Sequence, residues 1–186
     1  IGLTIVYFRF DTKGRTTKRI GYNLKGKYYL WDYSPVTETA YRGDSIITNF
    51  YNDQYRLKSR NIKIVDSSGR TIENSDFDKN LSLYQKLITR YDDKLSEIKI
   101  IRVDSNNNLY SDKNGMSTHV KRLDSHNQTF VREELFYDPR NELVDADHYN
   151  IGSKWIQIIY SQIKRRKENN EEVTLYLDST GKETYR

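Results

Sequence analysis

The chain has 186 residues, which is enough for one domain with a real hydrophobic core. Charged residues make up 31% of it and hydrophobic residues 35%, while 16 tyrosines raise the aromatic share to 13%, so an intrinsically disordered chain is excluded. The formal charge of +5 permits a polyanionic partner, and the absence of cysteine excludes disulfides and thiolate metal sites.

Hydropathy along the chain excludes a membrane helix. No run approaches the roughly 20 apolar residues that such a helix needs, so we expect no membrane segment in this chain. The first residue is Ile1 and not Met, so a signal peptide or anchor could have been removed ahead of it. The sequence leaves cellular location and oligomeric state open.

Three strands are predicted at the start of the chain. The β-branched and aromatic run over residues 4–10 predicts a strand that ends at Asp11, where turn residues follow. Residues 19–23 and 27–33 predict two more strands, and the turn at Gly26 between them makes the order antiparallel.

Apolar spacing predicts two helices in the middle of the chain. The first begins at about Thr39, and a short β-branched strand over residues 61–65 follows it. The second covers residues 76 to about 97 and has a continuous apolar stripe, and a strand over residues 97–103 comes next. Two strands separated by a helix predict a βαβ crossover with parallel strands. The stripe consists of Phe77, Leu81, Tyr84, Ile88, Tyr91 and Leu95.

The remainder of the chain alternates between strand and helix patterns. Residues 128–137 predict a strand and residues 138–141 a turn. Residues 153–167 predict a helix with apolar residues on one side, and residues 173–177 predict a final strand.

Four predicted strands end in Asp followed by short polar turn residues, in the segments FRFDTKG, KIVDSSG, IRVDSNN and LYLDSTG. One interpretation is structural, because Asp and Ser start turns by bonding nearby backbone N–H groups. The other is chemical, because carboxylates from several strand ends can converge on a hard cation such as Mg²⁺. Both interpretations stay open on the sequence alone.

The order of elements and acids over residues 4–103 resembles the ribonuclease H family. The core of that family is three antiparallel strands, a helix, a fourth strand, another helix and a fifth strand. Its first strand ends in Asp, here Asp11, and its first helix opens with Thr and an acid, here Thr39 and Asp44, where the family has Glu. Its fourth strand ends in Asp-Ser, which matches Asp66 and the residue after it.

The last acid of that family follows the fifth strand, and two positions fit it. Its spacing is reproduced by Val103, Asn108, Ser111 and Asp112. Asp145 closes a second segment that is similar to the family's Asn-Glu-x-x-Asp. Both positions stay open.

The resemblance implies an α+β fold in which a mixed sheet has an antiparallel three-strand start and a βαβ crossover. Residues 1–123 would form the ribonuclease H-like core, and residues 124–186 a C-terminal α/β extension packed on it. The resemblance also implies a metal-dependent nuclease that hydrolyses phosphodiesters with two Mg²⁺ or Mn²⁺ ions. The implied catalytic residues and metal ligands are Asp11, Asp44, Asp66 and Asp112, with Asp145 as a further metal ligand.

A basic run near the end of the chain offers another route to nucleic acid. Its cations could neutralise phosphates while neighbouring aromatics stack on bases. Cations in the last turn of a helix also interact favourably with the helix dipole, which needs no ligand. The candidate nucleic-acid-binding residues are Lys154, Lys164, Arg165, Arg166 and Lys167.

Two non-catalytic alternatives accompany the nuclease interpretation. One is a surface or virion interaction module built on β-hairpins, in which the Asp-Ser and Asp-Thr units are turns. The other is a nucleic-acid-binding protein that uses the basic run. The nuclease predicts a cytoplasmic location, and the interaction module predicts an extracellular or virion one.

Overall fold

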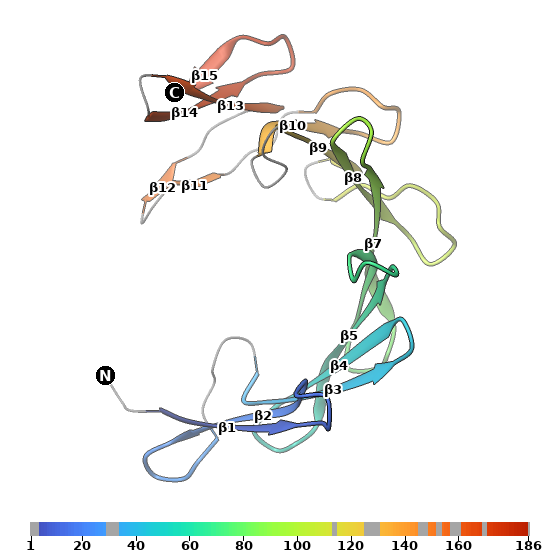
Figure 1. Cartoon of the computed structure of the whole chain (residues 1–186), viewed down its shortest axis with the longest axis vertical. Coiled ribbons are helices and arrows are strands. Elements are labelled where there is room, and N and C mark those ends of the chain that lie inside the picture. The colour runs from blue at the N-terminus through green and yellow to red at the C-terminus, as the bar shows by residue number, and fades with distance from the viewer. Residues whose placement is uncertain are drawn as a thin grey trace. The chain divides into compact units, whose positions relative to one another are not determined.

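Every regular element that the structure describes is a strand. The computed structural model describes residues 4–28, 34–112, 115–124, 131–144, 149–151, 154–156, 161–168 and 171–185. Figure 1 shows the strands coloured from blue to red along the chain. Their bounds are β1 Thr4–Phe10, β2 Thr16–Asn23, β3 Val36–Arg42, β4 Ser45–Tyr51, β5 Leu57–Val65, β6 Thr71–Phe77, β7 Leu83–Asp92, β8 Glu97–Val103, β9 Thr118–Leu123, β10 Val131–Tyr137, β11 Tyr149–Ile151, β12 Lys154–Ile156, β13 Gln162–Glu168, β14 Glu171–Leu177 and β15 Glu183–Tyr185.

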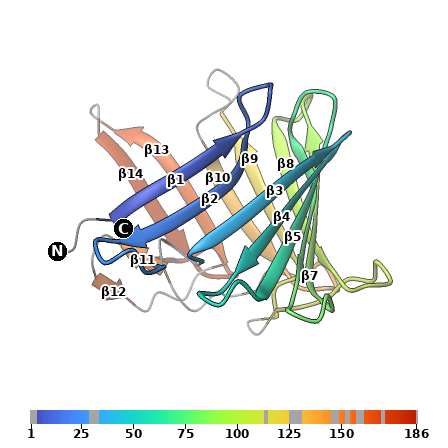
Figure 2. The same ribbon diagram turned by 90° about the horizontal axis from the view of Figure 1, so that it is seen from below.

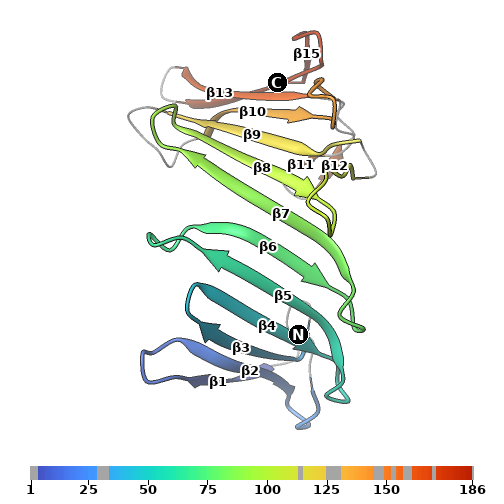
Figure 3. The same cartoon turned by 90° about the vertical axis from the view of Figure 1, so that its right-hand side faces the viewer.

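Thirteen of these strands form one antiparallel meander sheet. Its order is β1 to β10 and then β13, β14 and β15, while β11 and β12 pair only with each other. Figure 3 shows successive strands running in opposite directions. The expected α+β fold is therefore wrong, because the described residues contain neither a helix nor a parallel pair.

Internal contacts divide the chain into two compact units, Ile1–Lys86 and Leu87–Arg186. In the first unit, β1 to β5 lie side by side, as Figure 2 shows. Its buried apolar side chains among the described residues are Pro35 and Val36, and the buried Ser34, Thr37, Ser59 and Ser75 accompany them. The second unit buries far more apolar surface, from Ile101, Val103, Val120, Leu135, Phe136, Ile163, Tyr176 and Leu177.

Nine turns in the described part of the chain share one geometry. The first residue of each accepts a hydrogen bond from the backbone N–H of the fourth and donates its own N–H to the carbonyl of the fifth. The fourth residue always has a positive φ, between 58° and 84°. This is a three-residue hairpin loop, a type I turn closed by a left-handed residue. The turns begin at Asp11, Asn23, Asn52, Asp66, Asp78, Asp104, Asp112, Asp138 and Asp178.

The predicted helices in the middle of the chain are hairpins. The segment from Thr39 forms the end of β3, a tight turn and β4, and the segment over residues 76–97 forms the end of β6, a turn and β7. The strands that flank the second segment, β5 and β8, are separated in the sheet by β6 and β7, so no βαβ crossover exists there.

The third predicted helix, over residues 153–167, is also wrong where the structure describes it. That part of the chain forms β12 and most of β13. Several strand predictions are confirmed. The strands over residues 4–10 and 97–103 have the predicted bounds, and β2, β5, β10 and β14 contain or overlap four more of the predicted runs. The strand predicted over residues 27–33 lies mostly outside the described residues, which stop at residue 28 and resume at residue 34.

Candidate functional site

Two of the acids predicted to bind metal, Asp11 and Asp66, cap turns. The Asp11 carboxylate accepts hydrogen bonds from the backbone N–H groups of Lys13 and Arg15, each at 2.9 Å. The Asp66 carboxylate accepts the equivalent bonds from Ser68 and Arg70, also at 2.9 Å. These bonds satisfy backbone donors that the turn exposes, which is the usual role of Asp at such a position.

An arginine side chain completes each of these two caps. Arg15 and Arg70 are the fifth residues of their turns, and each guanidinium lies 2.8 Å from the capping carboxylate. The pKa of Asp11 is lowered, first by the backbone hydrogen bond from Arg15. The pKa of Asp66 is lowered, first by the side-chain hydrogen bond from Arg70. Both carboxylates are therefore ionised and already paired.

Two more of the predicted acids, Asp44 and Asp112, lie in other turns. Asp44 follows Gly43 in the two-residue turn between β3 and β4, where Gly43 has a φ of 61°. Asp112 caps a turn of the second unit by accepting the N–H of Met116 at 3.1 Å, and Arg102 lies 3.8 Å from its carboxylate. Asp145 lies outside the described residues.

The nuclease interpretation is wrong, because the structure does not assemble these acids. Strands β2, β3 and β4 separate the strand that ends at Asp11 from the strand that ends at Asp66. Among the described residues, no group of three or more Asp, Glu, His or Cys side chains could hold a metal ion. Mg²⁺ and Mn²⁺ therefore have no converging ligand set in that part of the chain.

The basic run lies on a strand and not on a helix. Its first three residues alternate between the two faces of β13, so Lys164 and Arg166 are exposed while Arg165 is half-buried. The Arg165 guanidinium lies 2.6 Å from the Glu134 carboxylate. Lys167 belongs to β13 and Lys154 to β12. Nucleic-acid binding by this run stays a prediction.

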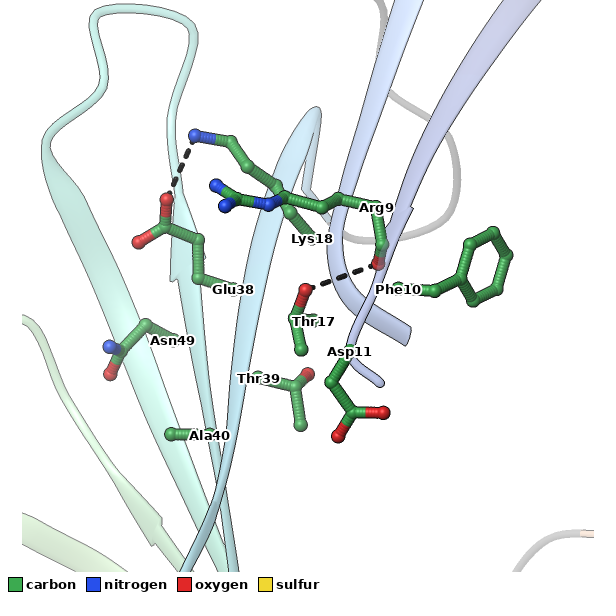
Figure 4. Close-up of a pocket in the computed structure, with 9 residues that line it drawn as sticks. All are labelled: Arg9, Phe10, Asp11, Thr17, Lys18, Glu38, Thr39, Ala40 and Asn49. Carbon is green, nitrogen blue, oxygen red and sulfur yellow. Dashed lines mark hydrogen bonds and ion pairs between the residues drawn. The ribbon is translucent and has the colours of Figure 1, made fainter. Parts of the chain in front are cut away.

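A hollow of about 490 Å³ opens in the first unit where β2 and β3 stop pairing. Only three residue pairs join these strands. The pair at the end that faces the hollow is Lys18 with Glu38. The hollow is lined from both sides of this separation, as Figure 4 shows. The lining residues are Arg9, Phe10, Asp11, Thr17, Lys18, Glu38, Thr39, Ala40 and Asn49.

A network of charged and tyrosine side chains closes one side of this hollow. The Lys18 ammonium lies 2.9 Å from the Glu38 carboxylate and donates a hydrogen bond to the Tyr55 hydroxyl at 2.8 Å. Glu38 also accepts hydrogen bonds from the hydroxyls of Tyr55 and Tyr51. The two tyrosine rings stack with their centroids 4.7 Å apart. Both oxygens of Glu38 are therefore occupied.

The electrostatics of this network follow from these contacts. Hydrogen bonds from Tyr55 and then Lys18 lower the pKa of Glu38. The hydrogen bonds that Lys18 donates to Tyr55 and then to Glu38 raise the pKa of Lys18. Burial and then the Glu38 charge raise the pKa of Tyr51. The network therefore holds a fixed ammonium and a fixed carboxylate across neutral pH.

Arg9 is the cation of the hollow that remains available. In Figure 4 its guanidinium extends toward the Lys18–Glu38 pair. Within the described residues, no ion pair engages it. A guanidinium offers five N–H donors in a planar fork.

The backbone of Tyr55 marks this network as unusual. Tyr55 is the fourth residue of its turn and has a φ of 58°, whereas five of the other eight turns place Gly there and two place Asn. A bulky side chain in this region costs roughly 1–2 kcal/mol. The stacking and hydrogen bonds of the side chain offset that cost, and backbone strain of this kind is enriched at functional sites.

The sequence carried a signal for this network. The segment that begins at Asn52 follows the same five-residue pattern as the turns with Gly, except that Tyr55 stands in the Gly position. Counting that pattern along the chain would have identified the turn, and the departure from Gly would have singled out Tyr55. The pairing of Lys18 with Glu38 depends on the register of β2 and β3, which the pattern does not reveal.

Comparisons with known proteins give the chain no family. No family model matches it, and no curated protein matches it. The fold places it in the class of antiparallel β-meander proteins, so the resemblance to the ribonuclease H family is wrong. Among solved structures the chain is similar to a porin-like protein from Bacteroides uniformis, with 9% identity and a TM-score of 0.32 over 90% of this chain and 85% of that chain.

The described residues contain no helix that is long and apolar enough to cross a bilayer.

Proposed function

We propose that the chain is a non-catalytic interaction module built on β-hairpins, and that the hollow between β2 and β3 binds an anionic group of its partner. The observation that carries the proposal is the Arg9 guanidinium, which lines the hollow without an ion pair to any described residue. The anionic group would be a carboxylate or a phosphate, since both accept two parallel N–H bonds from arginine.

The charges around the hollow favour an anion over a cation. Its two acids are already neutralised, Asp11 by Arg15 and Glu38 by Lys18. Arg9 then adds an uncompensated positive charge beside the Lys18 ammonium. An anion that enters the hollow would meet two cations and would find no unpaired carboxylate on the lining residues.

The rigid scaffold around Arg9 supports recognition and not chemistry. The Lys18, Glu38 and Tyr55 side chains hold one another in place, so little side-chain entropy remains to be lost there on binding. The turn acids beside the hollow serve the hairpins, and none of them lies within a group suited to a metal ion among the described residues.

The test uses an oligoglutamate peptide as the probe and an oligoglutamine peptide of equal length as its control. Binding is followed by the chemical shifts of the backbone amides of Arg9, Thr17 and Thr39. We expect saturable shifts with oligoglutamate alone, and these should weaken as salt is raised.

Arg9→Gln should remove most of the shift, because it deletes the charge while it keeps a polar side chain. Lys94→Gln is the matched control, since Lys94 is an exposed cation in a turn of the second unit. Equal losses for Arg9→Gln and Lys94→Gln would show that net charge alone attracts the peptide, and the proposed role of the hollow would then be abandoned.

A further inference from the structure

The two edges of the first unit carry different turns, and this difference lies outside the hollow. Because the strands are antiparallel, the turns after β1, β3 and β5 lie at one edge and the turns after β2, β4 and β6 at the other, as Figure 3 shows. We call the second set, residues 23–27, 52–56 and 78–82, the Leu24 edge.

Each turn of the Leu24 edge exposes a large apolar side chain. Leu24 is 65% exposed, Tyr55 42% and Leu81 45%. At the opposite edge, the turns over residues 11–15 and 66–70 contain no large apolar residue. Alternate turns are about two strand spacings apart, roughly 10 Å, so these side chains form a row.

The turns of the two edges also differ in whether a carboxylate pairs with their cations. At the opposite edge the capping residues are Asp, and the arginine at the fifth position of the turn pairs with the cap. At the Leu24 edge two caps are the neutral Asn23 and Asn52, whose side-chain oxygens make the same backbone bonds. Lys27 and Arg56 at the fifth position therefore lack a carboxylate cap, and within the described residues no ion pair engages either of them.

We infer that the Leu24 edge docks on an anionic lipid surface. The exposed Leu24 and Leu81 and the unpaired cations beside them match the two parts of such a surface, because the leucines can enter the headgroup region and the cations can meet the lipid phosphates. Lys25 and Lys79 are also exposed in these turns. A nucleic acid would favour aromatic side chains that stack on bases, whereas Leu24 and Leu81 are aliphatic.

The first test measures co-sedimentation of the whole chain with vesicles of phosphatidylcholine, with and without phosphatidylserine. We expect binding to the vesicles that contain phosphatidylserine and weaker binding as salt is raised. The paired change Leu24→Ser and Leu81→Ser should lower the partition coefficient about tenfold per leucine. Leu95→Ser is the control, because Leu95 is a 70% exposed turn leucine of the second unit, and it should leave binding unchanged.

The second test alters charge and keeps the turns. Asn23→Asp with Asn52→Asp gives this edge the acidic caps of the opposite edge, and we expect it to lower vesicle binding about fivefold per site. Asp66→Asn, the reverse change at the opposite edge, should not lower it.

Three outcomes would overturn the inference. One is equal binding to both kinds of vesicle, and another is binding that survives the paired leucine change. The third is a single-stranded oligonucleotide that binds with the same sensitivity to the Asn changes and none to the leucine changes, because the edge would then be a nucleic-acid surface.

Discussion

Tyr55 combines an unfavourable backbone conformation with an unusually well-connected side chain. Its ring stacks on Tyr51, and the Lys18 ammonium lies 4.9 Å from its ring centroid. Its hydroxyl both accepts from Lys18 and donates to Glu38, so this single side chain joins the two charges. The turn therefore positions the Tyr55 side chain between Lys18 and Glu38, and a Gly at the same position would leave this place empty.

Replacing Tyr55 by Phe tests this connection at the level of one hydroxyl. The hydrogen bond from Tyr55 is the largest cause of the lowered pKa of Glu38, so Tyr55→Phe should move that pKa back toward its ordinary value. The Glu38 carboxyl ¹³C shift, followed through an acid titration, gives the measurement. Tyr51→Phe removes a weaker contribution and should shift the pKa less, and the opposite ranking would contradict the account of the network.

The lowered pKa of Glu134 predicts how the stability of the second unit depends on acid pH. Burial would raise its pKa, but hydrogen bonds from His119 and Arg165 and their charges outweigh burial and bring the pKa to about 2. A lowered pKa in the folded state means that the stabilisation is complete above the unfolded value of 4.5 and is lost as the pH falls toward 2. The loss should be about 2–3 kcal/mol in the free energy of unfolding.

Urea unfolding at several pH values measures this fall in the free energy of unfolding at acid pH, which we call the acid limb. In Glu134→Gln the limb should flatten, because the titrating group is gone. Glu142→Gln, at an exposed position beside Arg140, should leave the limb intact. An acid limb that is unchanged in Glu134→Gln would assign the titration to other groups.

At the scale of elements, the turn pattern explains both where the sequence predicts the fold and where it fails. Strands β1 and β8 were predicted with their correct bounds, since each is a β-branched run ended by an Asp turn. The first central helix was predicted across the two-residue turn at Gly43 in spite of its glycine. Each central helix was also predicted across a five-residue turn, which begins at Asn52 in the first helix and at Asp78 in the second. These are the two turns of the nine in which a bulky residue, Tyr55 or Leu81, stands at the positive-φ position, so the Gly or Asn that would mark a hairpin is missing.

The apolar stripe that predicts the second helix also arises from apolar residues at turn positions. Leu81 and Leu95 are two of its six residues, yet both are exposed turn residues and neither is part of a buried face. Apolar spacing cannot distinguish a helix from two strands when the turn residues themselves are apolar. Of the residues that line the candidate site, the sequence pattern predicts a functional role for Asp11 alone, as a metal ligand. The others were missed because no local pattern reveals the register that sets Lys18 beside Glu38.

Leu81 provides a direct measure of strain in a hairpin turn. Its φ is 63°, so Leu81→Gly should relieve roughly 1–2 kcal/mol of strain against a cost of about 0.5–1 kcal/mol for the added backbone freedom of Gly. We expect a net stabilisation of about 0.5 kcal/mol in urea unfolding. Leu24→Gly, at the second position of its turn, carries the cost without the relief and should destabilise the protein. A loss of stability of equal size in both variants would remove the strain argument.

At the scale of the whole molecule, stability is distributed unevenly between the two units. Eight of the ten buried apolar side chains of the described residues belong to the second unit. The first unit depends instead on backbone ladders, capped turns and half-buried side chains. Amide hydrogen exchange should therefore be slower in β8, β9 and β10 than in β1, β2 and β3.

Ile163 is the side chain on which to test the core of the second unit. It is 1% exposed, so Ile163→Ala should cost about 2–4 kcal/mol from lost burial and the cavity that remains. Leu109→Ala, at a 49% exposed position of the same unit, should cost less than about 1 kcal/mol. Similar losses in the two variants would show that Ile163 does not lie in a packed core.

The meander order has a consequence for how the chain is made. Most strands pair with the strand synthesised just before them, and five of these connections are single turns of five residues. Closing such short loops costs little entropy, and the cost does not accumulate as the sheet grows. Low sequence separation between contacting residues favours rapid folding. Each hairpin can therefore form as soon as its second strand has left the ribosome, without waiting for a distant segment of the chain.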